Sequence, residues 1–427
     1  MKSIQSQIPS ATWKLLQQQL KYVEENSAFY QEKFQQLGIS ANQLKAKDFT
    51  QLPITTKEDL ASRNEDFICV PKREIIDYVT TSGTLGEPVT FALNETDLQR
   101  LAANEEKSFQ LAGVTPDDVV QITTTLDRRF IAGMAYFLGL RKLGAGLVRV
   151  GSGVPELQWD SIKRFKPTYL VAVPSFLIKL GNYAKANGID CKNTSIKAAI
   201  CIGESLRDEN FQLNALGKKI EELWGIELYS TYASTEMSTA FTECEAHEGN
   251  HILEDLIYTE IVDAKGNIVN DGEVGELVVT TLGIETMPLI RYATGDLVKK
   301  IIKPCKCGRE GARLSSVLGR KKQLIKYKGT SIYPPQITEA LADWSGIDLH
   351  LVKVSTSEVG TDHLEVVLPD SFQQQELAAL KAHLRAKLRV LPEISFWKTE
   401  KLQQTIFNPN HRKPIRFLDE RMKTDEV

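Results

Sequence analysis

Residues 80–91 read TTSGTLGEPVTF, and they gather hydroxyl side chains and glycines between two strand-like segments. Backbone N–H groups and hydroxyls in such a loop can hold the oxygens of a phosphate. The loop contains no lysine, however, and Glu87 stands beyond Gly86, so the pattern of a P-loop NTPase is not met. Taken alone, the loop is equally well explained as a surface turn. The candidate phosphate-binding residues are Thr81, Ser82, Gly83, Thr84 and Gly86.

Two later stretches carry an aromatic ring and carboxylates that suit a nucleotide. YASTE, residues 232–236, follows the strand-like IELYS, and ligands of α/β sheets bind at the carboxyl ends of strands. There Tyr232 could stack on a base, and Glu236 could bind Mg²⁺ through oxygen. Asp296 follows a Thr-Gly turn in MPLIRYATGDLV and could accept hydrogen bonds from ribose hydroxyls. Taken singly, each residue is as well explained by packing or solvation. The candidate nucleotide-binding residues are Tyr232, Ala233, Ser234, Thr235, Glu236 and Asp296.

Cysteine and histidine residues recur at metal-ligand spacing in two stretches. ECEAHEGNHILED supplies Cys244, His247 and His251, and PCKCGRE supplies Cys305 and Cys307. C-x-C-G forms a tight turn in which the glycine lets backbone amides face the thiolates. Three cysteines and one histidine would make a closed tetrahedral zinc site, and its metal would be structural because no position stays open. A set of reduced surface thiols is the alternative.

The elements expected to position these residues change in character along the chain. Residues 10–38 are predicted to form one helix, with Ser10 as its cap. Between residues 100 and 230, short apolar runs alternate with amphipathic segments, which is typical of a layered α/β sheet. After residue 250 turn residues break β-rich runs, which indicates a β meander. Beyond Gly319 strands and helices alternate in a small α+β region. The strands predicted in the α/β part are 119–123, 146–150, 169–173, 198–202 and 226–230.

Composition and charge limit the class of protein. The chain has 427 residues, more than one domain usually holds, so two or three domains are expected. A hydrophobic content of 42% and a formal net charge of -3 give no reason to expect nucleic acid or an anionic membrane as a partner. The first residues lack the apolar core of a signal peptide, and no apolar run reaches the roughly 18 residues of a membrane span. The six cysteines do not indicate a disulfide framework, so a cytoplasmic protein is expected.

These stretches, in this order, resemble the adenylate-forming superfamily of acyl-CoA synthetases, and most of all its phenylacetate–CoA ligase branch. TSGTLGEP resembles the phosphate loop of that family, YASTE its adenine and magnesium motif, and LIRYATGDL its ribose motif. GR…KG…YPPQI resembles the hinge into a mobile domain, and HRKPIRFLDER the C-terminal lysine segment. With FYQEKFQQLGI near the start, the likeness covers nearly the whole chain. The adenine-contacting turn IGES adds the candidates Gly203, Glu204 and Ser205.

The resemblance implies both a fold and a reaction. The fold would be α/β, with a large adenylation domain over residues 1–320 and a small, mobile α+β domain over residues 321–427. The large domain would hold layered α/β sheets and a β meander, with a zinc-binding β region at about 240–310. The reaction would join an aryl, phenylacetate-like acid to ATP, releasing pyrophosphate and forming an acyl-adenylate. Coenzyme A would then displace AMP, so the expected cofactors are ATP, Mg²⁺, coenzyme A and structural Zn²⁺.

The resemblance also assigns roles to individual residues. Lys413 would be the catalytic cation of the first step, beside Glu236 as the magnesium ligand. Arg320 would contact the nucleotide, and Lys322 would lie at the hinge, where many members have an acidic residue. His251 stands at the histidine position of the family and is preferred over His247 as the zinc ligand. The acid pocket would use Phe130, Gly133 and Tyr136, which core packing explains as well, and coenzyme A would meet Lys328 and Gly329.

One departure and two alternatives stay open. The family usually has lysine where this chain has Glu87, which bears on the affinity for ATP more than on the type of reaction. Lys57, Arg320 and Lys413 could supply the positive charge instead. The first alternative is an adenylating enzyme that loads an acyl-carrier protein, and the second is a non-catalytic nucleotide- or zinc-binding protein of this fold. The expected partners are small molecules, namely a carboxylic acid, ATP and coenzyme A, with no nucleic acid and no membrane; a homodimer is left open.

Overall fold

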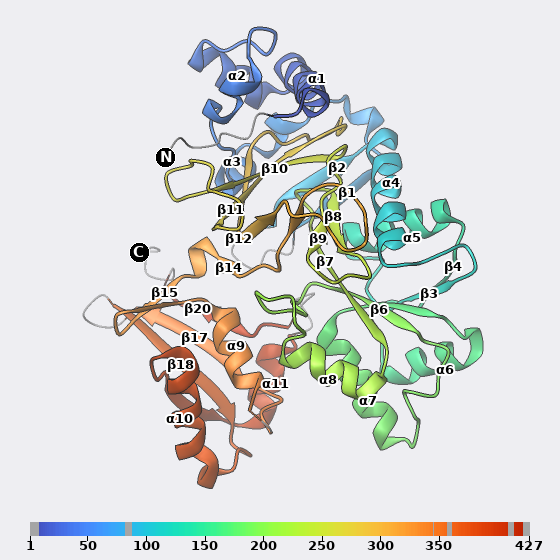
Figure 1. Cartoon of the computed structure of the whole chain (residues 1–427), viewed down its shortest axis with the longest axis vertical. Helices are drawn as coiled ribbons and strands as arrows, with labels where there is room; N and C mark the ends of the chain where they lie inside the picture. Colours follow the sequence, from blue (N-terminus) through green and yellow to red (C-terminus); the bar gives the residue numbers. More distant parts are fainter. Residues whose placement is uncertain (1–7, 82–87, 345, 357–360, 409–413, 422–427) are drawn as a thin grey trace. The chain divides into compact units, whose positions relative to one another are not determined.

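The computed structural model divides into two compact units, which Figure 1 shows as ribbons. The first comprises residues 1–213 and 217–316, and the second comprises residues 214–216 and 317–427. The domain boundary predicted at residue 320, and the mobility of the second domain, stay predictions. None of the helices within the described part of the chain combines the length and the apolar character needed to cross a membrane. The structure describes residues 8–81, 88–344, 346–356, 361–408 and 414–421.

Two helices open the first unit where the sequence reads as one. Helix α1 (Ser10–Asn26) buries Leu16 and Leu20 on one face, as its spacing predicts. Ser10 is already helical and Pro9 occupies the cap position, so the prediction of Ser10 as a cap is wrong. The break comes at Ser27, whose extended backbone ends α1 and whose side chain accepts the Tyr30 N–H to start α2 (Ala28–Leu37). The short helices that follow are η1 (Ala46–Gln51), α3 (Lys57–Ser62), η2 (Asn64–Phe67) and η3 (Lys72–Glu74).

One continuous sheet forms the centre of the first unit, with the strand order β10-β11-β12-β13-β9-β8-β7-β6-β5-β3-β4. From β4 to β7 neighbouring strands are parallel, and from β7 to β10 they are antiparallel. The strands predicted between residues 119 and 230 are confirmed, although β7 runs further than expected. The parallel strands are β3 (Val119–Ile122), β4 (Gly146–Arg149), β5 (Tyr169–Ala172), β6 (Ala198–Ile202) and β7 (Glu227–Ser234). The others are β8 (Thr239–Glu243), β9 (Asn250–His251), β10 (Ile257–Val262), β11 (Val274–Thr281), β12 (Tyr292–Ile301) and β13 (Arg313–Leu314).

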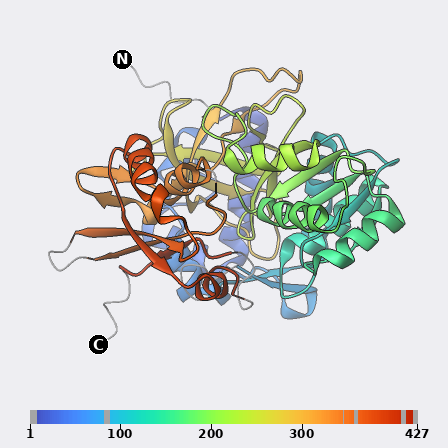
Figure 2. The same ribbon diagram turned by 90° about the horizontal axis from the view of Figure 1, so that it is seen from below.

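Helices cover both faces of the parallel part of the sheet. Val120 and Ile122 of β3 point into a core that α4 (Glu95–Leu111) and α5 (Ile131–Leu143) close. Gln121, between them, points to the other face and donates to the Gln158 side chain at 2.8 Å. That face carries the green helices on the right of Figure 2, which are α6 (Pro155–Phe165), α7 (Pro174–Ala186) and α8 (Ala215–Trp224).

The antiparallel part confirms the predicted meander, because β10, β11 and β12 pair in chain order. A separate hairpin of β1 (Asp77–Thr80) and β2 (Thr90–Leu93) flanks the proposed phosphate loop. A mixed sheet with helices on both faces, followed by a smaller unit, confirms the predicted fold class.

The second unit is built on a small mixed sheet. Its order is β19-β18-β17-β20, and α10 packs with β17 and β18 in one apolar core while α11 packs on the opposite face. A hairpin of β15 and β16 precedes it. The strands are β14 (Gly319–Arg320), β15 (Ile325–Tyr327), β16 (Thr330–Ile332), β17 (Leu351–Thr356), β18 (Asp362–Pro369), β19 (Glu393–Trp397) and β20 (Phe417–Asp419). The helices are η4 (Lys321–Gln323), α9 (Pro334–Ala342), η5 (Gln374–Glu376), α10 (Leu377–Leu388) and α11 (Thr399–Ile406).

One buried histidine of the second unit predicts how its stability depends on pH. Neither ring nitrogen of His350 has a hydrogen-bond partner among the described residues, and the side chain is 2% exposed. Burial, with Arg416 nearby, lowers the pKa of His350 to about 3. An unfolded histidine binds its proton near pH ~6.5, so the unfolded state is favoured increasingly as the pH falls below that value.

We expect this one group to remove roughly 1.4 kcal/mol of unfolding free energy for each pH unit between about 6 and 4. Urea unfolding of the wild type and of His350→Gln at pH 7 and pH 5 measures the difference. The variant should lose less stability on acidification than the wild type, whereas His363→Gln, at an exposed position, should behave like the wild type. Equal losses in wild type and His350→Gln would contradict the assignment.

Candidate nucleotide site and cysteine–histidine centre

The YASTE stretch forms the tip of a hairpin between β7 and β8. Strand β7 continues through Ser234 because Tyr232 pairs with Phe241 across to β8. The Met237 N–H donates to the Ser234 hydroxyl, which closes the turn after the strand. Glu236 therefore lies at the turn, partly exposed, at the carboxyl end of a parallel strand. This is the edge of the sheet where ligands of α/β proteins bind.

Two stretches meet at this edge: YASTE, which resembles the adenine motif and is called adenine-type below, and LIRYATGDL, which resembles the ribose motif and is called ribose-type. The Tyr232 hydroxyl donates to the carboxylate of Asp296 at 2.8 Å, although 64 residues separate them. The Tyr232 ring also stacks on Phe241, with the ring centroids 5.8 Å apart. Asp296 is buried, and its N–H donates to the Thr294 hydroxyl at 3.1 Å. Gly295 between them, with a φ of 76°, lies at a bulge within β12, so the turn predicted there is wrong. Two residues chosen independently from the sequence thus lie in direct contact.

Tyr292 joins this cluster and was not among the sequence candidates. Burial raises the pKa of the Tyr292 hydroxyl, and the carboxylates of Glu236 and Asp296 raise it further, with a hydrogen bond to Glu236. The hydroxyl therefore stays protonated and can orient the Glu236 carboxylate. Its place in the same LIRYATGDL stretch as Asp296 could have indicated a role.

The IGES turn is held from the side of α7. Gly203 has a φ of 79°, a conformation that favours glycine, directly after β6. The Glu204 carboxylate accepts the Ser175 N–H at 2.8 Å in the first turn of α7, a position where a negative charge is favourable. Glu204 thus has a structural partner, and its contact with adenine stays a proposal, as does that of Ser205.

The base of the proposed phosphate loop is closed by Thr81. Its N–H donates to the Val89 carbonyl at 2.9 Å, and its hydroxyl accepts the Val89 N–H at 3.0 Å. The remaining candidates of the loop lie outside the described residues, and so does Glu87. They are Ser82, Gly83, Thr84 and Gly86.

Two arginines beside this hairpin were also missed. The Thr80 N–H donates to the Arg129 carbonyl at 3.0 Å, so the segment after β3 lies against the end of β1. Arg128 and Arg129 each have a φ of 56°, which is rare for residues with a side chain. Both side chains are exposed, and no other described residue forms an ion pair with either. Only the tertiary contact brings them near the loop, so local sequence gives no sign of it.

The acid-pocket candidates of α5 have packing roles. Gly133 lies so close to the preceding loop that a Cβ would stand 2.3 Å from the Thr125 carbonyl oxygen, so no larger residue fits. Tyr136 is 4% exposed and meets Phe109 edge to face, with centroids 6.1 Å apart. Phe130 caps α5 and packs partly buried against the same core. Their part in an acid pocket stays a proposal.

The candidates of the second unit lie on different kinds of element. Lys328 and Gly329 form the two-residue turn between β15 and β16, with φ values of 48° and 80°. The Arg421 guanidinium donates to the Lys322 carbonyl at 3.4 Å. Arg320 lies in β14, and Lys413 lies outside the described residues. The nucleotide, hinge and coenzyme A roles of these residues stay proposals.

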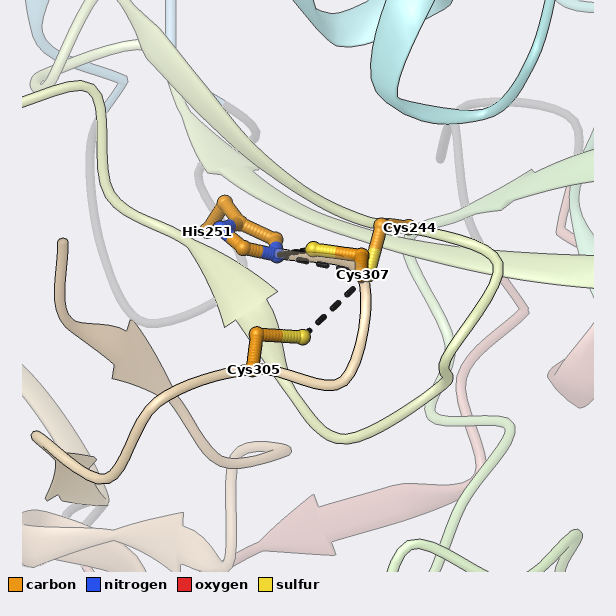
Figure 3. Close-up of side chains that lie close together, drawn as sticks. All are labelled: Cys244, His251, Cys305 and Cys307. Atoms are coloured by element: carbon orange, nitrogen blue, oxygen red, sulfur yellow. Dashed lines mark hydrogen bonds between the residues drawn. The ribbon is translucent and has the colours of Figure 1, made fainter. Parts of the chain in front are cut away.

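The cysteines and histidine from the two spaced stretches come together in Figure 3. The ligand atoms of Cys244, His251, Cys305 and Cys307 all lie within 4.8 Å of one another. Cys244 follows β8, His251 lies in β9, and the two other cysteines come from the segment after β12. His247 is not part of the group, because its ring lies between the carboxylates of Glu243, at 3.3 Å, and Glu227, at 3.4 Å.

The distances in this group fit tetrahedral zinc. Bonds of about 2.3 Å to sulfur and about 2.0 Å to nitrogen separate two sulfurs by about 3.8 Å, and sulfur from nitrogen by about 3.5 Å. The sulfurs of Cys244 and Cys305 are 3.6 Å apart, and His251 Nε2 lies 3.3 Å and 3.6 Å from the sulfurs of Cys244 and Cys307. The turn has the expected form, since the Gly308 N–H donates to the Cys305 carbonyl and the Arg309 N–H faces the Cys307 sulfur. Burial and nearby arginines lower the pKa of His251 to about 4, so its ring is neutral, as a metal ligand must be.

Comparison with known proteins shows what the chain is similar to. Residues 11–286 match the family model for AMP-binding enzymes. The chain is 29% identical to the phenylacetate-coenzyme A ligase of Thermus thermophilus, covering 76% of this chain and 73% of that protein. Identity to the phenylacetate-coenzyme A ligase of Escherichia coli is 28%, over 78% and 75%. A crystal structure of 2-hydroxyisobutyryl-CoA ligase, in the postadenylation state with R3-HIB-AMP, matches 97% of this chain and 91% of its own with a TM-score of 0.82 and 25% identity.

A sheet of this order, with adenine-type and ribose-type stretches in contact at the end of β7, defines an adenylate-forming enzyme. The chain belongs to the family of AMP-binding enzymes and, within it, to the phenylacetate–CoA ligase branch that its sequence resembles. The predicted class of enzyme, an AMP-forming acid–thiol ligase, is thereby confirmed.

Proposed function

We propose that the protein activates a phenylacetate-like aryl acid with ATP and transfers the acyl group to coenzyme A. The observation that carries the proposal is the hydrogen bond between Tyr232 and Asp296. It brings an adenine-type ring and a ribose-type carboxylate together at the carboxyl end of β7, where a nucleotide of this family would lie. The names of the curated relatives support the aryl acid, and they also support coenzyme A as the acceptor.

The residues of the cluster would share the work of the first step. Tyr232, with Ala233 to Thr235 beside it, would face the base, and Asp296 would accept from the ribose hydroxyls. Glu236 would hold Mg²⁺, which supplies charge neutralisation to the phosphates when it is bound. Tyr292 would keep the Glu236 carboxylate turned toward that position. The acid would lie near Phe130, Gly133 and Tyr136, and coenzyme A near Lys328 and Gly329, while Arg320 would contact the nucleotide and Lys322 would act in the hinge.

Positive charge near the phosphates would come from a place that the sequence did not indicate. The Arg129 carbonyl accepts the Thr80 N–H at the β1 end of the loop, Arg128 directly precedes it in the chain, and both residues are exposed. Two guanidinium groups there would compensate for a loop that has Glu87 in place of lysine. The family reaction can then proceed despite that departure.

The cysteine–histidine group would bind one structural Zn²⁺ through Cys244, His251, Cys305 and Cys307. The donor set and the distances support zinc rather than a cation that prefers oxygen ligands. Its chemistry would be limited to holding β8, β9 and the segment after β12 together, because the protein supplies every ligand.

ATP–pyrophosphate exchange over a panel of acids tests the proposal. The panel needs phenylacetate, benzoate, 2-hydroxyisobutyrate and acetate, followed by thioester assays with coenzyme A and with a holo-carrier protein. We expect the fastest exchange with an arylacetate and thioester formation with coenzyme A. No exchange with any acid would overturn the catalytic function, preference for 2-hydroxyisobutyrate would overturn only the aryl acid, and transfer to the carrier alone would overturn only the acceptor.

Glu87→Lys should lower the Michaelis constant for ATP a few-fold and leave the turnover number unchanged. An exposed charge next to the phosphates contributes about 0.5–1 kcal/mol, and it acts equally on the ground state and the transition state. Steady-state kinetics in ATP measure the effect, with Glu222→Lys as a control that makes the same change of charge at an exposed position of α8. Loss of activity in Glu87→Lys would make the glutamate a working residue and contradict the role of the loop.

A further inference from the structure

A buried ion pair joins Glu243, the residue before Cys244, to Arg207, which follows the IGES turn. The Arg207 Nε donates to both carboxylate oxygens of Glu243, at 2.9 Å and 3.0 Å, and the two side chains are 8% and 2% exposed. The remaining nitrogens of Arg207 donate to the carbonyls of Phe211, at 3.2 Å, and Leu228, at 3.0 Å. Each of the three guanidinium nitrogens therefore has a partner, an arrangement that the single ammonium of lysine could not reproduce.

The pair supplies hydrogen-bond partners to the backbone of β7 on the side where β8 does not yet reach. The ladder between β7 and β8 begins at Thr231, which pairs with Thr242. Just before it, the Ser230 N–H donates to the Glu243 carboxylate at 3.0 Å, and the Leu228 carbonyl accepts from Arg207. Residues 228 and 230 present their polar groups to the same side of a strand, so the ion pair takes the place of a partner strand there. Tyr232 follows two residues later.

The same pair holds the IGES turn from its second side. Arg207 lies two residues beyond Ser205, and Leu206 between them is fully buried. On the first side, the Glu204 carboxylate is bound to the Ser175 N–H of α7. The IGES turn is thus fixed between α7 and the carboxylate of Glu243. The position of IGES relative to YASTE therefore depends on the ion pair between Arg207 and Glu243.

We infer that Arg207 and Glu243 are positioning residues for nucleotide binding, which align the IGES turn with Tyr232. This inference rests on the proposed function, since it needs a nucleotide at that edge of the sheet. A nucleotide base would contact both IGES and YASTE, so it needs a fixed distance between them. A substitution of Arg207 or Glu243 should therefore weaken the binding of ATP and AMP alike. It should not change the chemical step, because neither residue belongs to the Glu236–Asp296 cluster. The affinity would be altered through geometry, without loss of any group proposed to touch the base.

Glu243→Gln is the informative variant, because it keeps the shape of the side chain and removes the charge. We expect ATP and AMP to bind roughly 10-fold more weakly by calorimetry, the Michaelis constant for ATP to rise to the same extent, and the turnover number to stay within about two-fold. Arg207→Lys should show a similar loss of affinity. The double variant should bind the nucleotides no more weakly than the worse single variant, because both single substitutions and their combination break the same interaction.

Asp118→Asn is the matched control. Asp118 is also a buried carboxylate paired with a cation, Lys197 at 2.7 Å. It directly precedes β3, so it lies at the amino-terminal ends of the parallel strands, whereas the proposed nucleotide site lies at their carboxyl ends. Asp118→Asn should lower the thermal stability and leave nucleotide binding unchanged. Metal content, measured in every variant, separates an effect on Cys244, the neighbour of Glu243, from an effect on the turn.

Each outcome decides the inference. Weaker nucleotide binding at unchanged metal content supports it. Reduced stability in Glu243→Gln with unchanged binding would make the pair structural only and overturn it, as would weaker binding that appears only when metal is lost. A wild-type protein that binds neither ATP nor AMP would overturn the proposed function together with the inference, whereas normal wild-type binding with an unaffected variant would overturn the inference alone.

Discussion

Lys413→Ala should slow acyl-adenylate formation by roughly 100-fold or more. The attacking carboxylate and the α-phosphate are both negative, and a fixed charge or donor at the developing charge of a transition state contributes about 10²–10³ in rate. ATP–pyrophosphate exchange measures this step. Thioester formation from supplied acyl-adenylate should be nearly unchanged, because the family uses the lysine only in the first step.

The fold should tolerate this change. Lys413 lies outside the described residues, but the chain just beyond it is held by backbone bonds, from the Ile415 N–H to the Ile406 carbonyl and from the Val352 N–H to the Arg416 carbonyl. Lys381→Ala, on the exposed face of α10, should leave both half-reactions unchanged. Equal losses in the two half-reactions of Lys413→Ala would contradict a role confined to adenylation.

The double variant Cys305→Ser, Cys307→Ser should lose its zinc completely. Protein purified without added metal is expected to contain one zinc per chain, and the variant none. Two of the proposed ligands would be missing, and a closed site contributes its binding energy to folding, so the midpoint of thermal unfolding should fall by roughly 5 °C or more. Metal analysis and thermal unfolding measure the two effects.

Cys69→Ser, a change outside the group, should keep the metal and serves as the control. Absence of stoichiometric zinc from the wild type, or unchanged zinc in the double variant, would show that the cysteines do not form a zinc site. The turnover number per folded molecule should stay close to that of the wild type, because no ligand position of the metal is open to substrate.

The elements that follow from local pattern were predictable from the sequence. Strands such as β5 and β6 are short apolar runs, each preceded by a polar residue, and their positions agree closely with the prediction. The break at Ser27 was not predictable from the periodicity, since apolar residues recur on both sides of it. The strand predicted at 226–230 ends short of β7, because the strand character of the last residues of β7 depends on pairing with β8, a contact that the sequence does not contain.

The same limit applies to the site. Tyr232, Glu236, Asp296 and the cysteines could be chosen because their residue types and motif order carry the chemistry. The contacts of Arg207, Tyr292 and Arg129 arise only when distant strands are brought together, so local spacing gives no indication of them. Gly133 was predicted to line the acid pocket, which stays a proposal, and the structure adds a close backbone contact that requires glycine there.

A metal that stayed bound to Cys244, His251, Cys305 and Cys307 would also constrain the chain before it is fully folded. A metal shared by Cys244 and Cys305 closes a loop across 61 positions, much as a disulfide would, but without needing an oxidising environment. In the chain-entropy model, a closure of this length disfavours the unfolded ensemble by about 4 kcal/mol. Strands β10, β11 and β12 lie within that loop, and β12 carries Asp296. Bound metal would therefore restrict the conformations open to β12 before the protein folds. Refolding with metal present should then reach the native pairing of β12 sooner.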